Sequence, residues 1–164
     1  MELNIDIFSA FNKSWALLTA GSMDEKNAMT ISWGSMGTLW GKPIVTVYVK
    51  PVRYTHSFME KSDVFTVSFF PEAYRKALTL LGTKSGRDGD KIGEAGLHPV
   101  KAGEGVGYEE AKLTLVCKKI YTLPFDRAAI PQEAIHAFYE TEEPHTMFVG
   151  EVLQIIPEKQ EEAK

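Results

Sequence analysis

Three segments of the chain carry side chains suited to binding a flat ligand with an apolar body and an anionic group. The first is Asn27-Ala28-Met29-Thr30-Ile31-Ser32-Trp33. Side chains alternate along a strand, so Met29 and Trp33 would share one face and Thr30 and Ser32 the other. Small side chains let a planar ring approach the backbone, and hydroxyls can hydrogen-bond to its polar edge. An ordinary amphipathic strand would show the same pattern.

The second segment, Lys50 to Ser57, follows the strongest β-rich run of the sequence. Arg53 and Thr55 stand where a helix is expected to begin. A guanidinium fork, hydroxyl donors and a helix N-terminus all suit a phosphate. The alternative is a helix capped by threonine beside a solvated arginine.

The third segment, Gly82 to Lys91, places three basic residues among glycines and hydroxyls. Such a loop can present backbone N–H groups and positive charge to an anion. Asp88 and Asp90 offset part of that field. A mobile, solvated loop is the alternative.

Motifs for other chemistries are incomplete. Pro43 follows Gly41-Lys42, where a phosphate loop needs a hydroxyl, and the glycines at 103, 105 and 107 miss the dinucleotide register. Calcium-loop and serine-hydrolase patterns are absent from the sequence. No second ligand stands at zinc spacing from any histidine, and we expect no metal site. The histidines are His56, His98, His136 and His145.

The elements that must position these residues are mostly strands. Apolar runs rich in β-branched and aromatic residues predict a mainly β fold, a small barrel with a few peripheral helices. Helices are expected over 55–61, 71–81 and 131–139, with Gly82 ending the second. One domain should span residues 1–157, before a charged, flexible tail over 158–164. The predicted strands are 15–20, 28–33, 44–49, 64–70, 113–121 and 147–156.

Composition limits the class of protein. The 164 residues suit one domain, and a net charge of −4 argues against nonspecific nucleic-acid binding. The single cysteine, Cys117, cannot form an intramolecular disulfide. With neither a secretion leader nor an apolar stretch long enough to cross a membrane, we expect a cytoplasmic protein.

Together the segments closely resemble the flavin reductase-like family that includes flavoredoxin. The resemblance implies an FMN-binding split β-barrel, usually a homodimer with the flavin near the subunit interface. It covers most of the chain and rests on these pieces: 27–33, Trp40-Gly41-Lys42-Pro43, 51–55, 65–71, Ser85-Gly86-Arg87-Asp88, Glu110-Ala111, Cys117, His145 and Gly150-Glu151.

Carried over by position, the resemblance implies three groups of cofactor-binding residues. Arg53 and Thr55 would hold the phosphate. Another group would close over the cofactor: Ser85, Gly86, Arg87 and Asp88. The remaining group would lie along the isoalloxazine ring and ribityl chain: Asn27, Met29, Thr30, Ser32 and Trp33.

The activity implied is hydride transfer from NADH or NADPH to bound FMN, with electrons then leaving to a flavin, metal or protein acceptor. The cofactor carries that chemistry, so no acid–base pair is required. His145 is a candidate for the nicotinamide side, or a satisfied histidine at a strand start. A noncatalytic FMN-binding electron carrier is the alternative function, and a barrel that binds haem through His56 or His145 is a third.

Overall fold

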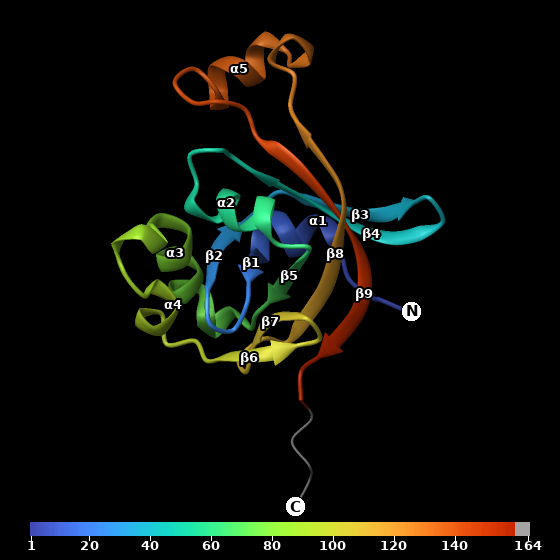
Figure 1. The fold of residues 1–164 in the computed structure, drawn as a ribbon, viewed down its shortest axis with the longest axis vertical. Helices are drawn as coiled ribbons and strands as arrows, with labels where there is room; N and C mark the ends of the chain where they lie inside the picture. The colour runs from blue at the N-terminus through green and yellow to red at the C-terminus, as the bar shows by residue number, and fades with distance from the viewer. Residues whose placement is uncertain (160–164) are drawn as a thin grey trace, which may run out of the picture.

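The computed structural model of the protein describes residues 1–159. A seven-stranded antiparallel sheet dominates the fold. Its strand order is β2-β1-β5-β8-β9-β4-β3, and a separate hairpin pairs β6 with β7 (Figure 1). The strands are β1 (Ala16–Gly21), β2 (Lys26–Ile31), β3 (Gly34–Leu39), β4 (Lys42–Val49), β5 (Val64–Phe69), β6 (Pro99–Ala102), β7 (Gly105–Tyr108), β8 (Leu113–Pro124) and β9 (Thr146–Pro157).

The sheet closes on itself. Its two outer strands, β2 and β3, are joined only by Ser32 and Trp33. Two residues span roughly 10 Å, so the edges must approach each other across this link. The sheet therefore curls into a barrel, and the predicted mainly β architecture is confirmed.

Two apolar clusters hold the elements together. One fills the barrel, with Phe65, Phe69, Leu115 and Phe148 almost fully buried. The other lies outside the barrel, where Leu17 and Ala28 meet Leu78 and Leu81, while α2 packs on β1 and β2. The strands between the clusters are thus covered on both faces, as their nearly continuous apolar runs indicate. The helices are α1 (Ile7–Ser9), α2 (Tyr54–Lys61), α3 (Arg75–Thr83), α4 (Lys91–Glu94) and α5 (Gln132–Phe138).

The N-terminal segment packs against the barrel core. Phe11, on a single π-helical stretch after α1, is buried and meets Phe69 edge-on, with ring centroids 5.7 Å apart. Gly34 at the start of β3 leaves room for this ring, because a Cβ there would lie 2.6 Å from Phe11.

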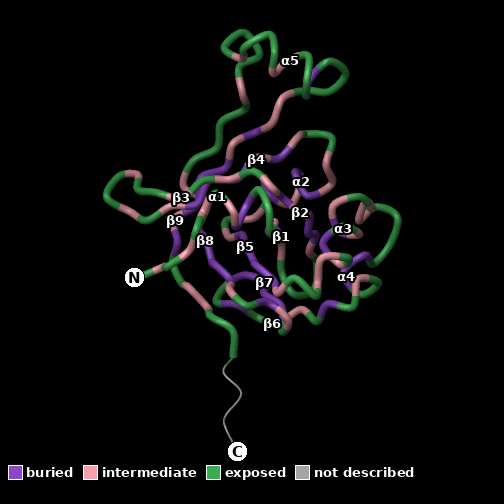
Figure 2. The backbone as a smooth tube through the Cα atoms, turned by 180° about the vertical axis from the view of Figure 1, so that it is seen from behind, coloured by how far each residue is buried: buried purple, intermediate pink, exposed green. Residues whose placement is uncertain are grey.

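β8 and β9 are long strands that leave the barrel together. Their outer ends carry residues 125–145, which we call the arm, with α5 at its tip (Figure 1). The N–H of Phe125 donates to the carbonyl of His145 over 3.0 Å and closes the base of the arm. Most of the arm is exposed, whereas β1, β2 and β5 are mostly buried (Figure 2).

Several predicted boundaries were wrong. Strands β3, β6 and β7 were not predicted. α3 runs through Gly82 to Thr83, and Arg53 rather than Thr55 is the N-cap residue of α2. The expected tail begins with exposed Glu158 and Lys159, and residues 160–164 lie outside the described part of the chain. In the described part, no helix is long and apolar enough to span a membrane.

Candidate functional site

A pocket of about 290 Å³ opens beside the Ser32–Trp33 link, where the barrel edges meet. This volume lies at the lower end of the range usual for small-molecule binding sites. We call it the ring pocket. It is lined by Met29, Thr30, Ile31, Ser32, Trp33, Tyr48, Lys50, Val52, Arg53, Glu142 and His145.

The predicted ring-binding segment lies at this pocket, and Met29 and Thr30 point to opposite faces of β2 as expected. Met29 is packed in the barrel core, while Thr30 faces α3 and donates its hydroxyl to the carbonyl of Leu78 over 2.5 Å. The hydroxyl oxygen of Thr30 keeps a lone pair for a ligand. The strand ends at Ile31, so Trp33 stands free of the sheet and is 42 % exposed. Four predicted residues line the ring pocket: Met29, Thr30, Ser32 and Trp33.

Arg53 connects the ring pocket with the start of α2. Its guanidinium donates to the carbonyl of Gly82 over 3.2 Å, and burial lowers its pKa. No side chain caps α2, and of its first three N–H groups that of His56 donates to the carbonyl of Arg53 over 3.0 Å, which leaves those of Tyr54 and Thr55 for a ligand. An uncapped helix N-terminus beside a partly buried cation is a good site for a phosphate.

The side chain of Thr55 lies between α2 and β2. Its side chain is buried, and its hydroxyl oxygen accepts a 2.8 Å hydrogen bond from the amide of Asn27. Asn27 is buried as well and lies outside the ring-pocket lining. The two side chains tie β2 to α2, so the first turn of the helix is held next to the ring-binding strand.

The third predicted segment folds over the same place. A Cβ at Gly86 would lie 2.1 Å from Oδ1 of Asn27 and 3.0 Å from the ring of Tyr54. Arg87 stacks on Tyr54, with its guanidinium 4.8 Å from the ring centroid. Ser85 accepts a hydrogen bond from the N–H of Arg87. Asp88 is exposed.

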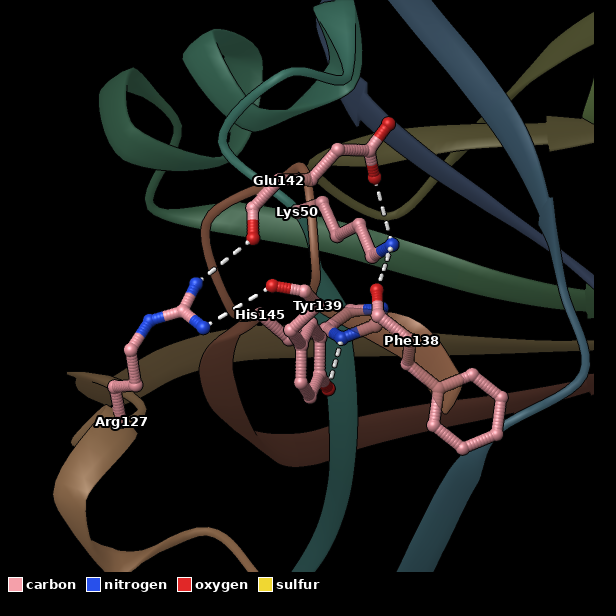
Figure 3. Close-up of polar contacts among 6 residues, drawn as sticks. All are labelled: Lys50, Arg127, Phe138, Tyr139, Glu142 and His145. Atoms are coloured by element: carbon pink, nitrogen blue, oxygen red, sulfur yellow. Dashed lines mark hydrogen bonds and ion pairs between the residues drawn. The ribbon is translucent and has the colours of Figure 1, made fainter. Parts of the chain in front are cut away.

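Glu142 and His145 of the arm form the remaining wall of the ring pocket, and Figure 3 shows the polar contacts that hold the arm in place. Lys50 at the end of β4 donates to Glu142 over 2.7 Å and to the carbonyl of Phe138 over 2.9 Å. Arg127 donates to the carbonyls of Tyr139 and Glu142, both over 3.0 Å. These contacts shape the arm and fasten it to the barrel.

His145 lies at the junction of the arm and β9. Burial, and then the charge of Lys50, lower its pKa to about 4, so its imidazole is neutral at neutral pH. Its Nδ1 lies 2.6 Å from the hydroxyl of Tyr139. A neutral ring can donate or accept a hydrogen bond, but it is a poor proton donor at pH 7.

His56 does not suit haem binding. Both ring nitrogens of His56 are engaged, Nε2 with Thr146 at 2.9 Å and Nδ1 with Glu60 at 2.7 Å. An axial ligand needs a free ring nitrogen. Nε2 of His145 has no hydrogen-bond partner among the described residues, so this restriction applies to His56 alone.

One group of potential metal ligands escaped the sequence analysis. The β6–β7 hairpin brings His98 close to Glu109 and Glu110, with ligand atoms within 4.8 Å of one another. His98 is exposed and pairs with Glu110, which raises the pKa of the histidine. The arrangement is explained by this surface ion pair.

Trp33 connects three cavities. It lines the ring pocket, an apolar cavity of about 800 Å³ under the arm and a cavity of about 870 Å³ beside α1. Leu123 and Phe138 in the arm cavity are about half exposed. The ring pocket is therefore bordered by exposed apolar surface.

Sequence reasoning missed the residues that the arm brings to the site. Glu142 belongs to an acidic stretch that reads as a solvated loop, and Arg127 and Tyr139 show no motif. Lys50 was within a predicted segment but was not assigned a role. Their contacts join residues up to 92 positions apart, and spacing carries no signal for such pairs.

A curled antiparallel barrel, with a ring pocket and a cationic subsite at its seam, defines the class of flavin reductase-like split barrels. The family model described as "Flavin reductase like domain" matches residues 8–164, and the chain belongs to this family. No curated protein matches the chain.

Solved structures share this fold. Flavoredoxin from Methanosarcina acetivorans matches with a TM-score of 0.72 and 23% identity over 98% of this chain and 76% of that chain. An FMN-binding protein from Thermus thermophilus with bound p-hydroxybenzaldehyde matches with a TM-score of 0.69 and 23% identity, over 89% of this chain and 72% of that chain. The NADH:FAD oxidoreductase of Streptomyces globisporus C-1027 matches with a TM-score of 0.68 and 18% identity, over 92% of this chain and 78% of that chain.

Proposed function

We propose that the protein binds FMN and passes electrons from NADH or NADPH through it to a flavin, metal or protein acceptor. The observation that carries this proposal is the convergence of three separate segments on one seam. β2, the start of α2 and the Gly86 loop meet there, with Asn27 bonded to Thr55 and packed under Gly86. The ring pocket opens alongside, and Arg53 belongs to both parts.

The residues at this seam fit the parts of FMN. The ring pocket offers the aromatic side chains of Trp33 and Tyr48 for the apolar ring and hydroxyls of Thr30 and Ser32 for its polar edge. Arg53, which also lines the ring pocket, and the start of α2 would hold the phosphate beside it.

Bound FMN supplies the two-electron chemistry, and the chain's own residues bind, orient and shield it. The neutral His145 and the Lys50–Glu142 pair border the ring pocket. These groups can fix a ring by hydrogen bonds while leaving one face open to a second ring. Contact between two oriented rings is the main requirement for hydride transfer.

The homologous structures support both functions that the sequence left open. One of these proteins is a flavoredoxin and another is an NADH:FAD oxidoreductase. A reductase accepts electrons directly from a nicotinamide, whereas a carrier needs a partner protein to reduce it.

We further propose that two copies of the chain form a homodimer through the arm face. Large apolar side chains stay exposed around the ring pocket, including Trp33, Leu123 and Phe138. Monomeric proteins rarely leave a continuous patch of this kind uncovered. A second copy seated there would cover the arm cavity and shield the ring pocket from water.

A flavin titration of Arg53→Ala tests the FMN assignment. A charge-assisted hydrogen bond contributes about 1.5–3 kcal/mol, so the variant should bind FMN about 10- to 100-fold more weakly. Lys76→Ala, which removes an exposed positive charge from α3, should bind FMN like the wild type. Equal affinity of Arg53→Ala and wild type would refute the phosphate assignment, and no binding by the wild type would refute the function.

A further inference from the structure

The hydroxyl of Tyr139 and Nδ1 of His145 lie 2.6 Å apart within the arm. Tyr139 follows the end of α5, and His145 begins the return into β9, so the contact closes the loop of residues 140–144 (Figure 3). The two rings meet edge to face, with centroids 5.5 Å apart. Among the residues that the structure describes, the His145 side chain makes this one hydrogen bond.

The protonation states determine the direction of this bond. Burial raises the pKa of Tyr139, and the phenol keeps its proton. The imidazole of His145 is neutral, so one ring nitrogen carries a hydrogen and the other is an acceptor. A phenol is a strong donor and a ring nitrogen a strong acceptor, whereas a phenol oxygen accepts weakly. Tyr139 therefore donates to Nδ1, and the hydrogen of His145 is on Nε2.

Nε2 of His145 is left available to a ligand. It makes no hydrogen bond with the described residues. Among these residues, every fully buried side-chain nitrogen or oxygen has a hydrogen-bond partner, so the unpaired Nε2 is accessible to solvent. The imidazole also lines the ring pocket. The N–H group at Nε2 can thus serve a hydrogen-bond acceptor that enters this pocket.

We propose that Tyr139 is a positioning residue that holds His145 in the tautomer with hydrogen on Nε2. The histidine then acts as a fixed donor to a carbonyl oxygen or ring nitrogen of a bound aromatic ring. The identity of that ring as a flavin or nicotinamide rests on the proposed function. The tautomer does not, because it is set by groups of the chain alone.

Tyr139 is itself held from several sides, which makes it suited to positioning. Its carbonyl accepts from Arg127 over 3.0 Å, and its N–H donates to Ile135 over 2.9 Å. The ammonium of Lys50 lies 5.4 Å from the centroid of its ring. Only 5 % of the residue is exposed. The phenol group therefore has little freedom to turn away from His145.

Nitrogen-15 NMR of the histidine rings in the protein without added cofactor tests the tautomer directly. In the wild type, we expect hydrogen on Nε2 of His145 and an unprotonated Nδ1. In Tyr139→Phe, the neutral ring loses its acceptor bond, and the pKa of His145 should rise by about half a unit to one unit. Tyr121→Phe, which removes a phenol hydroxyl from β8, should leave His145 unchanged.

A hydrogen on Nδ1 in the wild type would overturn the proposal, as would an unchanged His145 titration in Tyr139→Phe. The ring signals of His56 and His136 report whether each variant keeps its fold.

Cofactor titration then tests the use of this donor. His145→Gln retains an N–H donor and should bind FMN more tightly than His145→Leu. Tyr139→Phe should bind FMN about three- to ten-fold more weakly than the wild type, as expected for the loss of one hydrogen bond. If the wild type binds FMN and either Tyr139→Phe or His145→Leu binds it equally tightly, the proposed role of His145 as a donor is wrong. Failure of the wild type to bind FMN would refute the proposed function, and the NMR result would still decide the tautomer.

Discussion

The ammonium of Lys50 donates a 2.7 Å hydrogen bond to the carboxylate of Glu142, joining the end of β4 to the arm. The same ammonium donates to the carbonyl of Phe138. Both residues of the pair line the ring pocket, so this contact sets the distance between two of its walls.

Replacing Lys50 with Met should loosen the arm without unfolding the barrel. The pair is partly exposed, so its loss should lower the free energy of unfolding by about 1 kcal/mol or less. Amide hydrogens of α5 should exchange about five-fold faster, because the arm opens locally. Hydrogen-exchange mass spectrometry measures this difference.

Lys42→Met provides the matched control. Lys42 on β4 forms an ion pair with Glu151 on the neighbouring strand β9, away from the arm. Its α5 amides should exchange as in the wild type. Equal exchange in α5 for Lys50→Met and Lys42→Met would show that the Lys50 contact does not restrain the arm.

Gly86→Ala should displace the loop that covers the start of α2. Its Cβ would lie 2.1 Å from Oδ1 of Asn27, so the loop must move or the Asn27–Thr55 bond must break. Loss of one or two hydrogen bonds predicts FMN binding weaker by about ten-fold in a fluorescence titration. Gly37→Ala, whose Cβ would meet nothing within 4 Å, should bind normally. Tight binding by Gly86→Ala would place the cofactor away from this loop.

Lys91 makes stability depend on pH. Its buried ammonium donates to the carbonyls of Leu81 and Lys84, both at 3.0 Å. Burial, and then the charge of Arg53, lower its pKa from 10.5 to about 8. Between these values the unfolded chain binds more protons than the folded chain, so stability rises with pH. From pH 7.5 to 9.5, Lys91 should add up to about 2 kcal/mol to the free energy of unfolding.

Urea unfolding at these two pH values measures the effect. The difference between the two pH values should shrink in Lys91→Met and persist in Lys101→Met, where an exposed lysine on β6 is replaced. The same pH dependence in Lys91→Met and wild type would assign it to other groups.

The proposed dimer predicts a mass of twice the 18.3 kDa of one chain in light scattering. Leu123→Ser combined with Phe138→Ser removes two exposed apolar side chains from the arm cavity and should shift the protein toward monomer. Met23→Ser, in the turn between β1 and β2, should remain dimeric. A monomeric wild type, or a dimer unaffected by the double change, would contradict an interface at the arm.

The sequence predicted the parts of the fold whose signals are local. All six predicted strands are present, because each is a long apolar run. β3 and β7 were missed because glycines and polar residues interrupt them, and only pairing with a neighbour makes them strands. α3 passes through Gly82 because Lys84 still donates to the carbonyl of Leu80, and packing on β2 outweighs the weak helix propensity of glycine.

The candidate site was predictable to a similar extent. The ring-binding strand, Arg53 and the Gly86 loop do come together at the seam. Whether these residues bind FMN remains a prediction. The arm wall was not predictable, since Lys50, Tyr139 and Glu142 meet only after β8 and β9 fold. Trp33 gains its importance from its place at the barrel closure, which its sequence neighbours do not reveal.

An anaerobic absorbance spectrum of the protein loaded with FMN, before and after addition of NADH and then NADPH, tests the central claim most directly. The account predicts bound flavin bands that bleach within the time of catalytic turnover with one of the nucleotides. Bands that persist with both nucleotides but bleach with dithionite would contradict the reductase and indicate a carrier. Absence of FMN binding would contradict the account as a whole.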